Sequence, residues 1–169
     1  MPSIEELNYK IKVALMWLCK NDHFLIENFA NERSITHKFA EYIQFPFPEW
    51  NVDWGYNRGV EGVPKDLPDQ GTLYPDIIIH LRNTKCNLLV SEAKSIYSTD
   101  HSDEEDKYKI KAYVESPEYH YQFGLWIYFH RKIEGAKLHW FINQNGKRVP
   151  LKQNGQRNIK TLRMEFLNG

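Results

Sequence analysis

Hydrophobic residues recur every three or four positions at the start of the chain. Ser3 and Glu6 have the spacing of an N-terminal capping box, in which each side chain bonds to the backbone of the other residue. The apolar residues that follow at helical period are Ile4, Leu7, Ile11, Leu15 and Leu18. This pattern predicts a helix that ends near residues 21–22.

A second helical pattern follows a short helical segment expected at residues 24–30. Asn31 is placed to cap a helix from Glu32 to about Gln44, which the prolines at 46 and 48 end. Counting back by helical steps from Ile35 places Glu32 on the apolar stripe. Carboxylates are seldom buried unless they are paired or bind metal. The alternative is that Glu32 lies at the surface, where it favours the helix dipole.

Beyond residue 46 the pattern changes to that of strands. The predicted strands are 50–57, 74–81, 88–94, 119–129, 137–142 and a last one with alternating Leu162, Met164 and Phe166. A Gly- and Pro-rich loop is expected at 58–71, a turn at 143–146, and an acid-rich helix at 103–114. This order predicts an α/β fold with a central mixed β-sheet flanked by helices. We expect a single domain over 1–169, with a helical part (1–45), a core (46–130) and C-terminal strands (131–169).

Composition is that of an ordinary globular protein. Of the 169 residues, 41% are hydrophobic and 26% charged, which is enough for one core. No apolar run approaches the roughly 20 residues of a membrane span. Acids occupy the N-terminus where a signal peptide would carry bases. We therefore expect a cytoplasmic protein with no membrane partner. Cys19 and Cys86 are too few for a disulfide framework, and both are interpreted as buried small apolar residues.

Charge gives no global argument for nucleic acid, because 22 basic and 22 acidic side chains cancel. The distribution is uneven, however. Residues 144–169 contain six bases and one acid, Glu165. Such a segment can contact phosphates, or it can be a solvated surface segment, and charge alone does not separate the two.

The strands at 74–81 and 88–94 carry the candidate chemistry. If they form a hairpin that is symmetric about Thr84, paired residue numbers sum to 168, so that Asp76 faces Glu92. Opposed residues of an antiparallel pair have Cβ atoms roughly 5 Å apart, and like charges there are destabilising. Two carboxylates in an apolar hairpin therefore require a cation or a shared proton. Lys94 lies on the same strand face as Glu92, because side chains alternate with period two.

A divalent metal is the natural cation for such a pair. Asp76 and Glu92 can hold Mg²⁺ or Mn²⁺ and leave coordination positions for water and a phosphate oxygen, with the Ala93 carbonyl as a further ligand. A metal of this kind activates water and polarises phosphorus. Lys94 would position the attacking water or stabilise charge in the transition state. Glu32 would orient water or bind a second metal if its helix packs beside the hairpin.

These residues resemble a known group. Pro75-Asp76, followed after fifteen residues by Glu92-Ala93-Lys94, is similar to the motif of the PD-(D/E)XK nucleases, which have the restriction-endonuclease-like fold. An upstream helix with an acid, here Glu32, also resembles that layout. The resemblance covers about residues 32–114. It implies an αβββαβ core, Mg²⁺ dependence and phosphodiester hydrolysis. It also implies that Asp76 and Glu92 are metal ligands, that Lys94 is the catalytic lysine, and that Glu32 is the helix acid.

The resemblance favours a metal-dependent nuclease that acts on DNA, with a dimer or partner protein supplying specificity. The alternatives are the same metal site acting on RNA, and a catalytically silent binding or assembly module. Asp53, Gln122 and the segment 56–58 are weaker candidates for the same cleft. Two further matches to parts of the motif, at 68–69 and at 105–107, lack strand context, and both are interpreted as structural.

Overall fold

The computed structural model describes residues 2–28, 30–67, 71–72, 74–96, 103–143 and 159–165. At 67, 71–72 and 159–165 only the backbone is described. The predicted last strand is present as backbone, whereas most of the basic segment 144–169 and the predicted turn at 143–146 lie outside the described residues.

The described residues contain four α-helices, and the predicted N-caps Ser3 and Asn31 are confirmed. The helices are α1 (Ile4–Asn21), α2 (His23–Glu27), α3 (Glu32–Gln44) and α4 (Asp103–Glu115). Ser3 accepts a hydrogen bond from the Glu6 N–H at 3.2 Å, and Asn31 accepts one from the Ser34 N–H at 2.8 Å. Each cap satisfies one of the orphan donors of the first helical turn. Among the described residues, no helix is long and apolar enough to cross a membrane.

The main sheet has six strands in the order β1-β4-β5-β6-β7-β8. The strands are β1 (Asn51–Trp54), β4 (Ile77–His80), β5 (Asn87–Ser95), β6 (Phe123–Phe129), β7 (Lys137–Asn143) and β8 (Ile159–Glu165). Within the described strands, β5 and β6 are the one pair that runs parallel, and α4 lies in the crossover between them. The predicted mixed α/β sheet flanked by helices is therefore confirmed.

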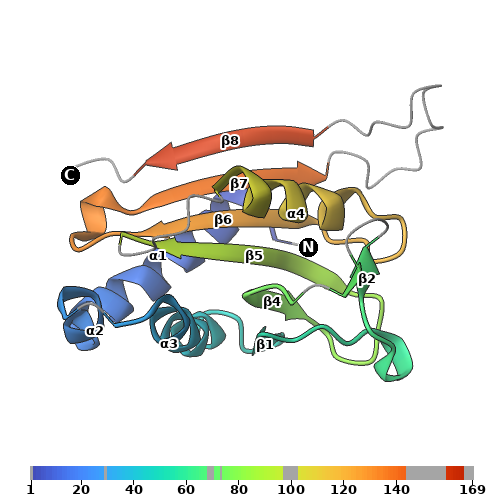
Figure 1. Cartoon of the computed structure of the whole chain (residues 1–169), viewed down its shortest axis with the longest axis horizontal. Helices are drawn as coiled ribbons and strands as arrows, with labels where there is room; N and C mark the ends of the chain where they lie inside the picture. Colours follow the sequence, from blue (N-terminus) through green and yellow to red (C-terminus); the bar gives the residue numbers. More distant parts are fainter. Residues whose placement is uncertain are drawn as a thin grey trace.

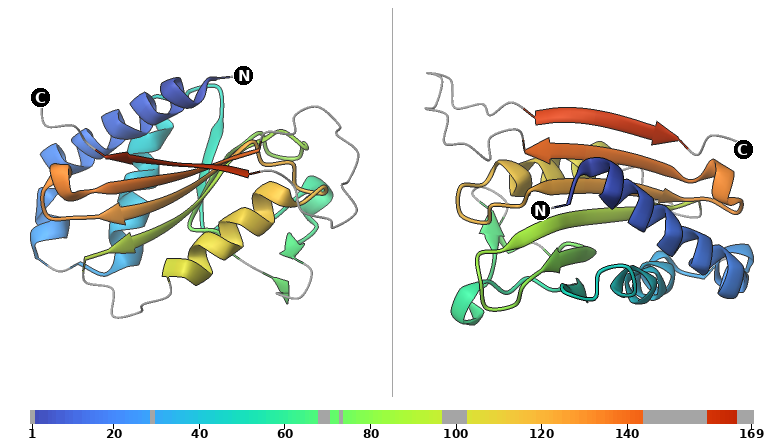
Figure 2. Two further views of the ribbon diagram at one scale, coloured as in Figure 1. Left: turned by 90° about the horizontal axis from the view of Figure 1, so that it is seen from above. Right: turned by 180° about the vertical axis from the view of Figure 1, so that it is seen from behind.

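Helices cover both faces of this sheet (Figures 1 and 2). On one face α1 and α3 bury Leu15 and Phe39 against sheet residues such as Leu89 and Ile127. On the other face α4 packs Ile110, Tyr113 and Val114 against Ile78, Val90 and Phe141. Side chains that alternate along β5 thus enter two different cores, which explains why every residue of this strand is buried.

Several predicted boundaries are wrong. The strand predicted at 50–57 is shorter than expected. The strand predicted at 74–81 begins only at Ile77, because Pro75 has no backbone N–H to donate to a neighbouring strand. The predicted 58–71 loop contains a 3₁₀ turn, η1 (Val60–Gly62), and a strand, β2 (Asp66–Leu67), that pairs with β3 (Gly71–Thr72). A second 3₁₀ turn, η2 (Ile133–Gly135), precedes β7.

The two cysteines differ from their predicted burial. Cys19 packs partly against the core formed by α1 and α3, but Cys86 is exposed. Cys86 follows the turn between β4 and β5, where its backbone N–H bonds to the Thr84 hydroxyl at 3.0 Å. The prediction failed at Cys86 because turn residues face solvent whatever their hydropathy.

Candidate active site

The hairpin register is the one predicted from symmetry about Thr84. Ile77 pairs with Ser91, Ile78 with Val90 and Ile79 with Leu89, so that each pair of numbers sums to 168. The register shifts by one residue at His80, which pairs with Asn87. The shift lies near the turn, and the pairs from Ile77 to Ile79, which lead towards the carboxylates, keep the predicted alignment.

Strand β5 continues past the end of β4, and two carboxylates bond to its open edge. The Ala93 N–H donates to Asp76 Oδ2 at 2.8 Å, and the Ser95 N–H donates to Glu32 Oε2 at 2.9 Å. Alternate N–H groups of a strand point to the same edge, and an unpaired one is costly when buried. Asp76 and Glu32 thus replace the missing neighbour strand and are held about 7 Å apart along β5.

Glu92 and Lys94 lie on the face of β5 that α4 covers. Lys94 Nζ is 3.1 Å from Asp106 Oδ2 of α4 and 3.9 Å from Glu32 Oε1. Glu92, Lys94 and Asp106 are 7%, 8% and 4% exposed. The structure therefore brings together all four predicted residues, Glu32, Asp76, Glu92 and Lys94, and adds Asp106. These five residues are called the carboxylate–lysine cluster below.

Burial raises the pKa of Glu92 well above its ordinary value, and the nearby Asp76 and Asp106 charges raise it further. Burial also raises the pKa of Asp76, although the Ala93 N–H and a hydrogen bond with Glu92 oppose that rise. A hydrogen bond between two carboxyl groups requires a proton, and the raised pKa values of both groups favour a proton that Asp76 and Glu92 share. A shared proton would relieve the repulsion that the sequence predicts.

Glu32 turns towards the sheet rather than lying free on the helix surface. Burial raises the pKa of Glu32, while the Ser95 N–H and the Lys94 ammonium lower it. Its side chain is 29% exposed, so it lies at the rim of the cluster. The interpretation of Glu32 as an acid on the inner stripe is correct, since the first turn of α3 reaches the edge of β5.

The donor chemistry fits a hard divalent cation. Four carboxylates face two ammonium groups, those of Lys94 and of Lys109, whose Nζ lies 3.4 Å from Asp106 Oδ1. The group carries two net negative charges when every member is ionised, and Mg²⁺ and Mn²⁺ prefer oxygen ligands. The Ala93 carbonyl points to the same strand edge as its N–H and thus towards Asp76.

In the part of the chain that the structure describes, no three His, Cys, Asp or Glu side chains are arranged as a metal site. The positions are instead those of an internally paired cluster, in which Lys94, Lys109 and a proton shared by Asp76 and Glu92 would offset most of the negative charge. A cation that binds here would have to displace that proton, because metal ligation requires ionised carboxylates.

Asp106 is the cluster member that the sequence interpretation missed. Its run, 103–106, has four successive acids and looks like a solvated helix start. In the structure Asp106 is buried and pairs with Lys94, so it lies in the cluster rather than at a solvated helix start. The helical spacing of Asp106 from the buried Ile110 and Tyr113 would have indicated its inward direction.

The weaker candidates do not join the cluster. Asp53 accepts hydrogen bonds from His80 at 2.7 Å and from the Arg82 Nε at 2.9 Å, and these three residues form a separate polar group. Gln122 precedes β6 by one residue, and its amide donates to the His120 carbonyl at 3.1 Å. Since Glu92 aligns with Trp126 in β6, Gln122 lies towards the far end of the sheet.

Comparisons with known proteins gave no relative. No family model, no curated protein and no solved structure matches this chain.

Proposed function

We propose that this chain is a metal-dependent nuclease of the PD-(D/E)XK type that hydrolyses phosphodiester bonds in DNA. The observation that carries the proposal is the joint placement of Asp76, Glu92 and Lys94 at one end of two paired strands, with Glu32 reaching them from α3. When the small β2–β3 sheet is left out, the order of helices and main-sheet strands is α3-β1-β4-β5-α4-β6, which supports the proposal because it is the αβββαβ order that the resemblance implies.

Each cluster residue has a separate task in this proposal. Asp76, Glu92 and the Ala93 carbonyl would hold Mg²⁺ or Mn²⁺. When bound, such an ion lowers the pKa of a water molecule and polarises the phosphate. Lys94 stabilises negative charge that develops on the phosphate oxygens. Glu32 orients water from the rim of the cluster. Asp106 is a positioning residue, since it acts by holding Lys94 at 3.1 Å.

Two lysines lie beside the cluster, over aromatic rings of β6. Trp126 and Tyr128 of β6 align with Glu92 and Lys94, and their rings stack with centroids 6.1 Å apart. Trp126 is 6% exposed and is covered by Lys107, whose Nζ lies 4.8 Å from the ring. Tyr128 is half-buried, and Lys137 lies over it at 5.6 Å. Lysines contact phosphates, so Lys107 and Lys137 are the groups of this face that support a nucleic-acid substrate.

A cleavage panel tests the proposal. Supercoiled plasmid, single-stranded DNA and RNA are incubated with Mg²⁺ and wild-type protein, Glu92→Gln, or the control Glu104→Gln. Glu104 is on the same helix as Asp106, but its side chain is 88% exposed. We expect DNA cleavage that Glu92→Gln reduces at least a hundredfold and that the control retains. Cleavage of RNA alone would move the substrate to RNA, and equal rates in both variants would refute the site.

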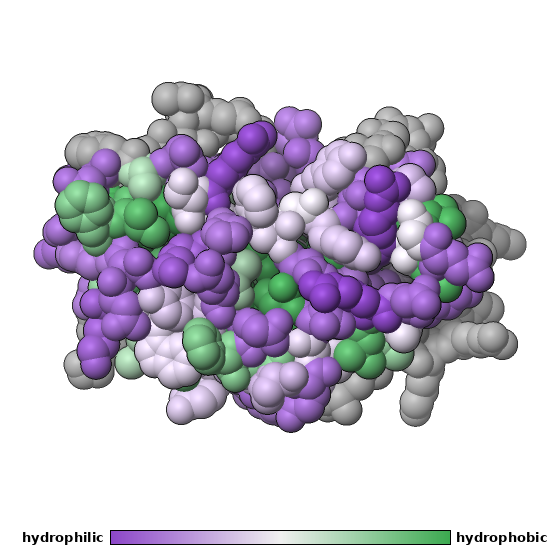
Figure 3. Space-filling model, turned by 90° about the horizontal axis from the view of Figure 1, so that it is seen from below, coloured by the Kyte–Doolittle hydropathy of each residue, from purple (hydrophilic) through white to green (hydrophobic). Residues whose placement is uncertain are grey.

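The second candidate function is a catalytically silent module. It is favoured by the internal pairing of the cluster, because Asp76 and Glu32 already cap the β5 edge and Lys94 is paired with Asp106. A protein-docking face would, however, call for a contiguous apolar patch. In the view of Figure 3, the apolar residues lie in separate patches among hydrophilic ones. This candidate predicts a protein that cleaves no substrate and does not bind Mn²⁺ in the cluster.

A further inference from the structure

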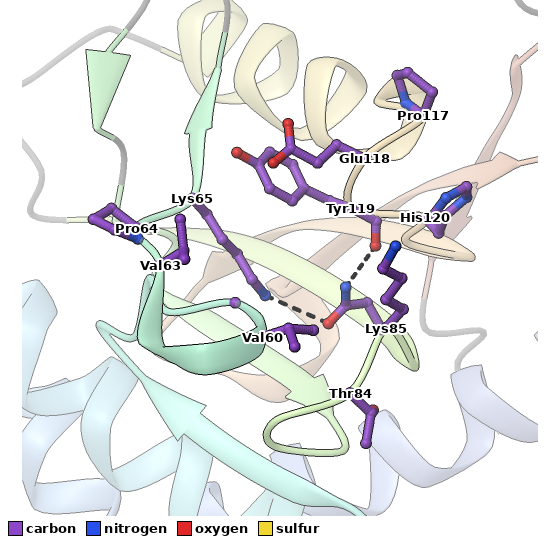
Figure 4. A pocket seen from close by; sticks show the side chains of 12 residues that line it. Val60, Val63, Pro64, Lys65, Thr84, Lys85, Pro117, Glu118, Tyr119 and His120 are labelled. Carbon is purple, nitrogen blue, oxygen red and sulfur yellow. Dashed lines mark hydrogen bonds between the residues drawn. The ribbon is translucent and has the colours of Figure 1, made fainter.

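A pocket of about 270 Å³ lies at the opposite end of β5 from the carboxylate–lysine cluster. The η1 turn, the turn between β4 and β5, and the segment that follows α4 surround it (Figure 4). Asn87, at the start of β5, lines it. Since Glu92 is five residues further along the strand, the two sites are about 17 Å apart.

A buried ammonium group lies in this pocket. Lys65 is 2% exposed, and its Nζ lies 2.8 Å from the Tyr121 hydroxyl and 3.4 Å from Asn87 Oδ1. Both partners are neutral, and among the described residues no carboxylate forms an ion pair with Lys65. Asp53 acts on it only as a charge at a distance and is itself bound by His80 and Arg82. A buried charge without a counter-ion is costly, which points to an anion that the pocket receives.

The groups around Lys65 are fixed in place. The Asn87 amide donates to the Tyr119 carbonyl at 2.5 Å, so its oxygen is turned towards Lys65. Tyr121 is completely buried. An ammonium has three donors, and Tyr121 and Asn87 account for two of them. Among the described residues no third acceptor bonds to Lys65, so its remaining N–H can donate to a ligand.

The rest of the lining favours an anion. Lys85 and His120 line the pocket, and Glu118 is the only acid among its described lining residues. Burial lowers the pKa of Lys65 to about 8, which leaves most of this lysine protonated at pH 7. The volume is at the lower limit of ordinary ligand pockets, which begin at about 300 Å³, so it suits a small group.

We propose that this pocket binds a phosphate group, with Lys65 as the buried cation. A phosphate offers several acceptor oxygens, and a lysine ammonium serves it as a point charge. The phosphate can come from free inorganic phosphate or from a nucleoside 5′-monophosphate. The proposal is independent of the nuclease function, because the pocket shares no residue with the carboxylate–lysine cluster.

Calorimetric titration in a buffer free of phosphate, sulfate and metal tests the proposal. Inorganic phosphate and adenosine 5′-monophosphate are titrated separately into wild-type protein, Lys65→Met, Val63→Trp and the control Lys111→Met. Val63 lines the pocket but is 57% exposed, so a larger side chain there blocks the pocket without touching the Lys65 contacts. Lys111 is an exposed lysine of α4 outside the pocket.

We expect saturable binding by wild type and Lys111→Met, and at least tenfold weaker binding by Lys65→Met and Val63→Trp. Binding of inorganic phosphate alone identifies the free ion, and tighter binding of the monophosphate identifies the nucleotide. Val63→Trp keeps the test valid if Lys65→Met does not fold. The proposal is overturned if wild type binds neither compound, or if the two pocket variants bind as wild type does. Glu92→Gln should bind phosphate normally, which separates this test from that of the nuclease site.

Discussion

The ion pair between Lys94 and Asp106 gives the sharpest prediction about stability. Lys94→Met removes the charge but keeps an unbranched side chain. Asp106, 4% exposed, would then lose a partner at 3.1 Å and keep only Lys109 at 3.4 Å. Breaking a buried pair costs about 3–5 kcal/mol, and the remaining lysine places this case at the lower end, about 3 kcal/mol. For a chain of this size, that lowers Tm by about 6–12 °C.

Urea denaturation at pH 7 measures this loss, and the double variant Lys94→Met/Asp106→Leu is its control. Replacing both charges by apolar groups removes the uncompensated carboxylate, so the double variant should recover most of the stability. A loss below 1 kcal/mol in Lys94→Met would show that the pair behaves like an exposed surface pair. The interpretation of Lys94 and Asp106 as a buried ion pair would then be refuted.

Three further predictions concern other parts of the fold. Between the ordinary carboxyl pKa and the raised pKa of Glu92, the folded protein binds one proton more than the unfolded chain. The free energy of unfolding in metal-free buffer should therefore fall as pH rises. Glu92→Gln should flatten that slope in urea titrations from pH 5 to 8. Burial raises the pKa of Asp53, but the hydrogen bonds from Arg82 and His80 outweigh burial, so the net pKa is lowered. The stability that Asp53 contributes is therefore present above about pH 4 and is lost as pH falls. Asp53→Asn should lower the free energy of unfolding by about 1–2 kcal/mol at pH 7, and an unchanged loss of stability in acid would contradict this. A Cβ at Gly124 would overlap Ile110 Cγ2 and approach Val114 Cγ2 to 3.0 Å. Gly124→Ala should therefore destabilise the protein by about 1–3 kcal/mol. Because the two contacted residues belong to α4, the substitution should also displace that helix and weaken Mn²⁺ binding in calorimetry.

Much of the local structure could be predicted from sequence, because the decisive interactions are short in range. The Ser3 and Asn31 caps act within one turn of their helices. The register of β4 on β5 follows from a short turn centred on Thr84, and it places Asp76 next to β5, where it accepts the Ala93 N–H.

The missed features depend on contacts between distant segments. Asp106 is one of four successive acids, and only the packing of α4 on β5 makes it the partner of Lys94. Lys65 lies in a segment rich in Gly and Pro, where a lysine is ordinarily exposed. Its burial results from residues 22 and 56 positions away in sequence, Asn87 and Tyr121, which close over its ammonium.

Calorimetric titration of Mn²⁺ tests the central claim most directly, because it requires no knowledge of the substrate. Asp76→Asn is the decisive variant, since an amide oxygen can still accept the Ala93 N–H while the charge is lost. The account predicts saturable binding by wild type and Glu104→Gln, with release of a proton from Glu92, and no saturable binding by Asp76→Asn. Equal, weak binding by all three proteins would contradict the metal site and favour the silent module.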